Sequence, residues 1–315
     1  MVPAESDERA RLRVVLEQLA GQDPLLNIRQ DDRHGEISVS LYGEVQKEVV
    51  EATLADDFGL EVAFRETTPI CVERPTATGE AVEILNAESN PFRATIGLRV
   101  EPAPIDSGIE FRAEVDHRTV PLYVFKTGDS FAEHMDQYVR EALQEGLYGW
   151  QVTDCRVTLT ECNYSVPDGP PSRRGPLSTA ADYRKLTPMV VMQAHERAAT
   201  AVCKPIVLVH IETPADTVGA VMSLTTRLGA ALAASATRGQ LSTLETMLPT
   251  ARASDLQRQI PGLTHGEGVV EMEFGGYERV RAPEPTRRRT TPNPLNRGEY
   301  LMYLARRATS VTTQR

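Results

Sequence analysis

The sequence predicts an α+β protein of three tandem units followed by a basic segment and a helix. The 315 residues exceed one average domain. Helical and strand patterns alternate in short runs, and one order of elements occurs near both ends of the chain. With 41% apolar and 25% charged residues, the composition is that of a protein with packed cores. We expect units at 1–68, 69–202 and 203–280, with a basic linker and C-terminal helix at 281–315.

The first unit is predicted to be a split sheet that lacks most of its first strand. The expected elements are helices at 5–20, ending at Gly21, and at 44–58, and strands at 26–30, 36–41 and 60–66. Val49 is expected on the buried side of the second helix. One strand in front would complete a βαββαβ ferredoxin-like unit, but only residues 2–4 are available for it. We therefore expect an exposed sheet edge and the least stable of the three units.

The middle unit is predicted to be an antiparallel sheet with amphipathic helices. The expected strands are 70–73, 81–85, 92–100, 109–115 and 154–161. Residues 131–146 are the clearest helix, because Phe131, Met135 and Val139 share one face. A loop follows at residues 165–177, where prolines and glycines exclude regular structure.

Two helix starts are expected directly after this loop. Thr179 and Asp182 fit a capping box, and Thr187 followed by Pro188 fits an N-cap with proline in the first turn. The two signals predict a helical turn, a kink and then a longer helix that ends near Ala199.

The third unit repeats the βαββαβ order in full. Its expected elements are a strand at 206–212, a helix at 214–228, strands at 230–236 and 241–248, a helix at 251–260 and a strand at 269–274. Residues 281–296 form a linker rich in proline and arginine, and residues 299–308 predict a short terminal helix.

The charge of the chain is unevenly distributed. The formal net charge is −10, yet residues 281–315 hold eight arginines and two glutamates, a net of +6, so the preceding residues carry −16. This arrangement argues against a generally basic nucleic-acid binder but leaves two interpretations of the tail. It is either a solvated surface or a contact for a polyanion.

Several kinds of chemistry are not expected from the sequence. The four cysteines (Cys71, Cys155, Cys162 and Cys203) form no CxxC pair, the six histidines are scattered, and we expect no metal site. The motifs GxxxxGK[ST] and GxSxG are missing, and no set of residues indicates a nucleophile with its base. The sequence has no apolar run of about 18 residues and no signal core. We therefore expect a cytoplasmic protein with no membrane partner.

Several segments carry distinctive residue strings. Glu145–Cys155 contains Gly-Leu-Tyr-Gly-Trp, and it is closely similar to a segment of tetracycline ribosomal protection proteins, as are Asn90–Val100 and Pro176–Arg184. Asp23–Leu26 and Ser40–Val49 resemble the third domain of elongation-factor-G-type translational GTPases. The resemblance covers nearly the whole chain, so the chain is identified as a C-terminal part of such a protein that lacks the GTPase domain.

This resemblance implies a fold and a set of partners. Residues 1–68 would correspond to domain III, residues 69–202 to domain IV with a ribosomal-protein-S5-like fold, and residues 203–280 to domain V. The implied partners are the 70S ribosome, through the 16S rRNA decoding region and 23S rRNA, and the chain's own missing N-terminal GTPase domain. GTP and magnesium belong to the full-length family, so we expect no cofactor in this chain and no GTPase activity by itself.

The resemblance also indicates candidate site residues. The family's tip motif resembles Tyr-Ser-Pro-Val-Ser, whose ends match Tyr164-Ser165 and Pro176-Leu177-Ser178, while Val166–Gly175 is extra sequence. Apolar side chains can contact bases, and arginines can contact phosphates. The expected rRNA-binding residues are Tyr164, Ser165, Arg173, Arg174, Pro176, Leu177, Ser178 and Arg184.

Four functions remain open from the sequence. The first is the ribosome-binding part of a tetracycline resistance protein, whose tip loop reaches the decoding centre and releases tetracycline while an absent domain hydrolyses GTP. The second is a fragment of a general elongation factor G-like protein. In the third, a separate chain or reading frame supplies the GTPase domain. The fourth is a stand-alone enzyme with a cleft between split sheets, which would require a deep pocket with converging titratable groups.

Overall fold

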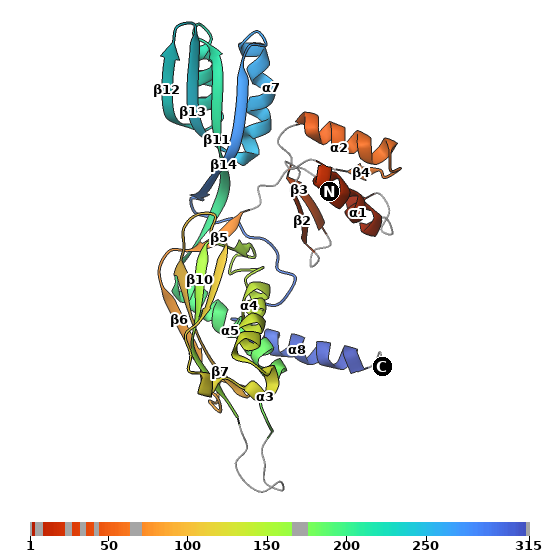
Figure 1. Ribbon diagram of the computed structural model, residues 1–315, viewed down its shortest axis with the longest axis vertical. Coiled ribbons are helices and arrows are strands. Elements are labelled where there is room, and N and C mark those ends of the chain that lie inside the picture. The colour runs from red at the N-terminus through yellow and green to blue at the C-terminus, as the bar shows by residue number, and fades with distance from the viewer. Residues whose placement is uncertain are drawn as a thin grey trace. The chain divides into compact units, whose positions relative to one another are not determined.

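The structure is a computed structural model that describes residues 2–3, 9–22, 27–31, 36–40, 44–63, 71–165 and 176–312 (Figure 1). Its fold is α+β, as the sequence predicts, with helices packed on mostly antiparallel sheets. The chain divides into two compact units. Unit 1 comprises Met1–Ile70 and Lys204–Gly276, and unit 2 comprises Cys71–Cys203 and Tyr277–Arg315.

The N-terminal part of unit 1 has the βαββαβ order with a very short first strand. Its elements are β1 (Val2–Pro3), α1 (Arg9–Gln22), β2 (Asn27–Asp31), β3 (Glu36–Ser40), α2 (Glu44–Asp56) and β4 (Val62–Ala63). β1 pairs antiparallel with β4, and β2 pairs antiparallel with β3. Two separate two-stranded sheets result in the described residues of this N-terminal part. A strand of two residues offers too few backbone groups to join them.

The small core of this part lies between the two helices and β4. It consists of Leu12, Val15, Leu16, Val50, Leu54, Leu60 and Val62. The predicted buried position of Val49 is wrong, because its side chain is 57% exposed and its neighbour Val50 points inward. Gly21 lies inside α1 rather than after it, so the helix extends two residues beyond the expected end at residue 20.

The C-terminal part of unit 1 is a complete βαββαβ unit. Its elements are β11 (Thr200–Pro214), α6 (Val218–Arg227), β12 (Ala231–Arg238), β13 (Leu241–Pro249), α7 (Ala253–Leu263) and β14 (Val269–Arg279). The strand order is β12-β13-β11-β14, and β13 pairs antiparallel with both β11 and β12. Every second residue of β11 from Val207 to Ile211 is buried, because a sheet covered on one face needs period-two alternation. These residues pack against α6 and α7 through Val221, Leu224, Leu256 and Ile260.

Unit 2 is built on the four-stranded sheet β6-β7-β10-β8. Its strands are β6 (Gly79–Glu83), β7 (Ala94–Pro102), β8 (Ile109–Ala113) and β10 (Cys155–Tyr164). β10 pairs antiparallel with β7 and parallel with β8. The parallel pair requires a crossover, and α4 (Gly128–Ala142) lies within it. β5 (Val72–Pro75) pairs with β9 (Gln151–Val152) and with Thr200–Cys203 of β11.

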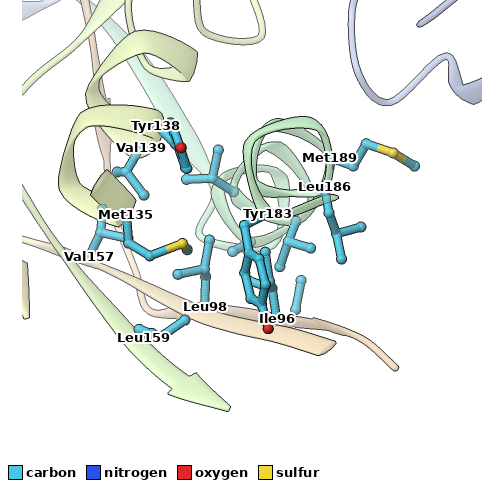
Figure 2. Packing of buried hydrophobic residues seen from close by; sticks show 14 of the residues in the cluster. Ile96, Leu98, Met135, Tyr138, Val139, Val157, Leu159, Tyr183, Leu186 and Met189 are labelled. Carbon is cyan, nitrogen blue, oxygen red and sulfur yellow. The ribbon is translucent and has the colours of Figure 1, made fainter. Parts of the chain in front are cut away.

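The core of unit 2 lies between this sheet and the two helices α4 and α5 (Ala180–Arg197). Figure 2 shows side chains of both helices directed at the sheet residues Ile96, Leu98, Val157 and Leu159. The predicted face of α4 is confirmed, since Phe131, Met135, Tyr138, Val139 and Leu143 are all buried. Burial of each large apolar side chain contributes about 1.5–3 kcal/mol, so this core fixes the elements that carry the candidate loop.

Helix α5 runs without interruption through Pro188. The predicted second start at Thr187 is therefore wrong, although the capping box at Thr179 and Asp182 is confirmed. Proline lacks the N–H that would donate to the Arg184 carbonyl four residues earlier, and α5 continues without that hydrogen bond. Leu186, Met189 and Val190 are fully or almost fully buried on either side, so tertiary packing holds the helix together across the proline.

The C-terminal segment belongs to the same unit. α8 (Arg297–Thr312) places the buried Tyr300 against the core, and the Tyr300 hydroxyl donates to the carbonyl of Lys185 in α5 at 3.0 Å. Leu295 and Leu304 also pack on this core. The predicted terminal helix is thereby confirmed and is longer than expected.

Candidate nucleic-acid interface

The candidate loop leaves the unit 2 sheet at the end of β10 and returns just before α5. Its two ends are joined by backbone and side-chain hydrogen bonds. The N–H of Ser165 donates to the Ser178 hydroxyl at 2.8 Å, and the N–H of Ser178 donates to the Ser165 carbonyl at 3.4 Å. The Ser178 hydroxyl in turn donates to the carbonyl of Arg93. Ser178 is only 2% exposed, so its side chain holds the loop base and does not face a ligand.

Tyr123 completes the loop base, and the sequence did not indicate it. It lies in the single-turn helix α3 (Leu122–Phe125), which is too short to show periodicity. Its hydroxyl donates to the Ser178 carbonyl at 3.0 Å and lies 3.5 Å from the Ser165 carbonyl. Its ring centroid is 5.6 Å from that of Tyr164 at an interplanar angle of 58°. Desolvation by partial burial raises the pKa of Tyr123, so the phenol keeps the proton that it donates.

The start of α5 is attached to the sheet at the same place. The Asp182 carboxylate accepts from the Thr179 N–H at 2.7 Å and from the N–H of Arg93, at the edge of β7, at 3.1 Å. Tyr183 is fully buried and donates through its hydroxyl to the Asn163 carbonyl of β10 at 2.9 Å. The edge of β7, the end of β10 and the start of α5 are thus fixed to one another beside the loop.

The described candidate residues differ in how far they are exposed. Tyr164 and Ser165 are half-buried, and Pro176 and Arg184 are exposed. Leu177 is 49% exposed, similar to Tyr123 at 50%, although contact between an apolar side chain and water is unfavourable. Arg173 and Arg174 lie outside the described residues, together with the rest of 166–175. The structure therefore gathers Tyr164, Ser165, Leu177, Ser178 and Tyr123 around one loop base.

The glycine-tryptophan segment has a different role, because it wraps around a buried carboxylate. Glu73 of β5 is fully buried and accepts from the N–H groups of Leu147 at 2.7 Å, Tyr148 at 2.8 Å and Trp150 at 3.0 Å. The imidazole Nε2 of the buried His195 lies 3.4 Å from the same carboxylate. Backbone donors converging on one carboxylate define a tight turn, which we call the Glu73 turn (residues 146–150).

Both glycines of the Glu73 turn have a steric reason. A Cβ on Gly146 would overlap the Glu73 carboxylate. Gly149 has a φ of +84°, and a Cβ there would overlap the carbonyl of Arg287 in the C-terminal linker. Glycine alone tolerates both the left-handed conformation and the close approach. The distinctive residue string is therefore explained by folding.

The C-terminal linker is docked on this turn by polar contacts. Glu145 accepts from the N–H and hydroxyl of Thr290 at 2.8 and 2.6 Å and from the hydroxyl of Thr291 at 2.9 Å. Burial by itself would raise the pKa of Glu145, but these hydrogen bonds and the charge of Arg289 outweigh it and hold the pKa below its usual value. The indole N–H of Trp150 donates to the Pro285 carbonyl at 2.7 Å.

Some arginines of the basic tail are thereby used inside unit 2. The Arg289 side chain is only 14% exposed and donates to the carbonyl of Glu145 at 2.8 Å. Arg297 pairs with Glu83 at 2.9 Å. Neither of the two expected roles of the tail, solvated surface or polyanion contact, describes these two residues.

Catalytic features are weak in the described part of the chain. The four cysteines are buried and form no disulfide, and desolvation raises the pKa of Cys155 and Cys162 to about 12, which leaves these two thiols protonated and unreactive. Among the described residues, no group of three or more histidine, cysteine or acidic side chains could hold a metal ion. A depression of about 490 Å³ is lined by Leu147, Tyr148, Glu196, Ala199, Thr200, Asn293 and Leu295. Glu196 and Tyr148 are its only ionisable groups, so it offers no converging acid and base.

No helix in the described ranges is both long enough and apolar enough to cross a bilayer.

Two family models define the class of this fold, which is of the elongation factor G type. Residues 61–199 match the family model for elongation factor G domain IV, and residues 201–288 match the model for the elongation factor G C-terminus. The crystal structure of a protein from Thermus thermophilus superposes with a TM-score of 0.64 over 89% of this chain and 40% of that chain. Its identity of 20% supports a shared fold alone.

Curated relatives identify a narrower group. The chain is 36% identical to the oxytetracycline resistance protein of Streptomyces rimosus over 97% of its own length and 44% of the relative. It is 41% identical to the tetracycline resistance protein TetM of Streptomyces lividans, over 84% of this chain and 39% of the relative. The tetracycline resistance protein TetP of Clostridium perfringens is 31% identical over 95% and 44%. The chain belongs to the elongation factor G-like family that includes these tetracycline resistance proteins, and it spans less than half their length.

Proposed function

We propose that this chain is the ribosome-binding C-terminal portion of a tetracycline ribosomal protection protein. In this proposal the loop between Ser165 and Ser178 reaches the decoding region of 16S rRNA and releases tetracycline bound there. The loop base carries the proposal, because three elements hold it while it presents Pro176 and a half-exposed Leu177 to the outside.

The physical argument rests on pre-organisation. Ordering a free loop on binding costs about 1–2 kcal/mol per backbone residue, and the joined ends of this loop have already lost part of that freedom. Leu177 and Pro176 provide apolar surface for a base or sugar face. Arg184, exposed on α5, provides a guanidinium for a phosphate, a contact that weakens as salt screens it.

GTP hydrolysis would be supplied by a domain outside this chain. In the proposal, GTP and magnesium bind that domain. Residues 204–276 contact 23S rRNA, and residues 69–202 contact 16S rRNA. This chain alone would bind the ribosome without turning over GTP.

The test is co-sedimentation of the 315-residue chain with 70S ribosomes that carry labelled tetracycline, at low and high salt. We expect association that weakens with salt and an increased release of tetracycline. The double variant L177A/R184Q should lower both effects, and the control L232A/R238Q should not, since Leu232 and Arg238 are exposed residues of β12 far from the loop in sequence. Failure of the wild-type chain to sediment with ribosomes at either salt would refute the proposal.

A general elongation factor G-like role is the second candidate, because both matching family models describe elongation factor G domains. The same experiment separates the two functions. A translation factor fragment would bind ribosomes equally with and without tetracycline and would release none of it.

A further inference from the structure

The depression in unit 2 lies where three distant segments of the chain meet. Its volume of about 490 Å³ is within the range of about 300–1,000 Å³ that is typical of small-molecule sites. The Glu73 turn, the junction between α5 and β11, and the C-terminal linker each contribute to the lining. We call it the linker pocket, and its lining residues are Leu147, Tyr148, Glu196, Ala199, Thr200, Asn293 and Leu295.

Hydrogen bonds behind the linker pocket hold its walls in place. The N–H groups of Leu147 and Tyr148 donate to the buried Glu73 carboxylate at 2.7 and 2.8 Å. The Thr200 hydroxyl donates to the carbonyl of the buried His195 at 3.1 Å. A ligand therefore meets walls that need little further ordering, which lowers the entropic cost of binding.

Ala199, in the same wall, has a strained backbone. Its φ is +52°, in the left-handed region that favours glycine. Its carbonyl accepts from the N–H of Thr76 at 2.9 Å, which helps to fix this conformation. Residues held in such sparsely populated conformations are concentrated at binding and catalytic sites, so the strain favours a binding role for this wall.

The chemistry of the lining selects the charge of a ligand. Glu196 is exposed and is the single formally charged side chain among the described residues that line the pocket. Leu147 and Leu295 offer apolar surface, and the ring of Tyr148 adds an aromatic face that attracts cations. A metal ion fits poorly, because one carboxylate falls far short of the six to eight oxygen ligands that a cation such as Ca²⁺ takes.

We infer that the linker pocket binds small organic cations with an apolar body, and that Glu196 selects their ammonium group. This site is separate from the loop base and does not depend on the proposed ribosome binding. A ligand in the pocket contacts α5 through Glu196 and the C-terminal linker through Leu295 at the same time. Binding therefore stabilises the docked state of the linker.

The test titrates the full chain with three probes that share one apolar body and differ in charge: phenylbutylamine, phenylbutanol and phenylbutanoate. Trp150 is the single tryptophan of the chain and belongs to the buried cluster on which Tyr148 packs, so its fluorescence reports binding. The melting temperature, measured by circular dichroism, should rise with the concentration of phenylbutylamine.

The expected preference follows from the exposure of the carboxylate. An exposed ion pair strengthens binding by up to about fivefold, so phenylbutylamine should bind about threefold to fivefold more tightly than phenylbutanol, and phenylbutanoate most weakly. E196Q should abolish this preference, and E196K should reverse it in favour of phenylbutanoate. E133Q is the matched control, because Glu133 is exposed on α4 of the same unit, and it should keep the wild-type preference.

Each outcome decides the inference. Saturable binding with the expected order, lost in E196Q and reversed in E196K, would support it. Equal affinities of the three probes for the wild-type chain, or no saturable binding of phenylbutylamine, would overturn it. A wild-type preference that persists in E196Q or E196K would also overturn it, because the cation would then bind elsewhere on the chain.

Discussion

Replacing Glu73 by glutamine tests the role of the Glu73 turn. The carboxylate accepts three backbone N–H groups, one on Oε2 and two on Oε1, at 2.7, 2.8 and 3.0 Å, and its side chain has no exposed surface. A glutamine keeps the shape but has only one acceptor oxygen. Whichever way the amide is oriented, its NH₂ group meets at least one N–H donor of the turn.

The expected loss follows from these contacts. A buried donor without a partner costs about 1–3 kcal/mol, and two remaining hydrogen bonds lose their charge assistance at about 1 kcal/mol each. We expect E73Q to lower the free energy of unfolding of unit 2 by about 4 kcal/mol, or about 8–16 °C in melting temperature. Losses of this size are exceptional for a substitution that adds no volume.

The assay uses the single tryptophan of the chain, Trp150, which lies in the turn itself. Its fluorescence follows urea unfolding of unit 2 directly. E196Q is the matched control, because Glu196 is exposed on the same unit and undergoes the same chemical change. If E73Q and E196Q unfold within about 0.5 kcal/mol of each other, a range typical of surface substitutions, the turn does not depend on this carboxylate and our reasoning is refuted.

Four other predictions concern separate features. Gly149→Ala should cost about 3 kcal/mol or more in the same fluorescence assay, because the positive φ and the Arg287 carbonyl both oppose a Cβ; a cost below about 1 kcal/mol would contradict this. The pKa of Glu145 is lower in the folded protein than the unfolded value of about 4.3. The ionised Glu145 therefore stabilises the fold fully above that pH, and this stabilisation is lost as pH falls through the folded pKa. The free energy of unfolding of E145Q should lack this part of the pH dependence, and an unchanged pH dependence would contradict the prediction. Tyr123→Phe should raise amide hydrogen exchange at the loop base by up to about tenfold while leaving global stability almost unchanged, whereas a lowered global stability would show that the phenol supports the whole unit. β2 and β3 should exchange amide hydrogens faster than the other described strands, since they form a separate sheet of only two strands; the best protection in the chain at these strands would disprove it.

Much of the fold could be predicted because local patterns and tertiary packing agree. The buried face of α4 and the alternation along β11 follow from apolar spacing alone. The errors occur where packing overrides a local signal. Pro188 does not end α5, because the buried neighbours Leu186, Met189 and Val190 hold the helix in place. Val49 and Val50 are both apolar, and only the position of α1 decides which one is buried.

The candidate site divides in the same way. Tyr164, Ser165, Pro176 and Leu177 were predicted from the sequence, since loop composition and resemblance both indicated them, and their RNA-binding role stays a prediction. Tyr123 could not be found, because it contacts the loop base at two residues, Ser165 and Ser178, that lie 42 and 55 positions further along the chain. No periodicity reveals contacts at such separations.

The amino-acid sequence by itself determined the order of elements, the two βαββαβ patterns and the family resemblance, because these depend on residue type and short spacing. Only the tertiary structure decided which polar residues are spent on folding. Ser178 was expected to bind RNA, but its side chain is buried in the loop base. Arg289 lies in the tail for which a polyanion contact was one interpretation, but it donates a hydrogen bond to the carbonyl of Glu145. The reason is physical: a buried polar group needs a hydrogen-bond partner, and that partner can come from any part of the chain that folds close to it. The linear sequence does not give the distance between two such groups.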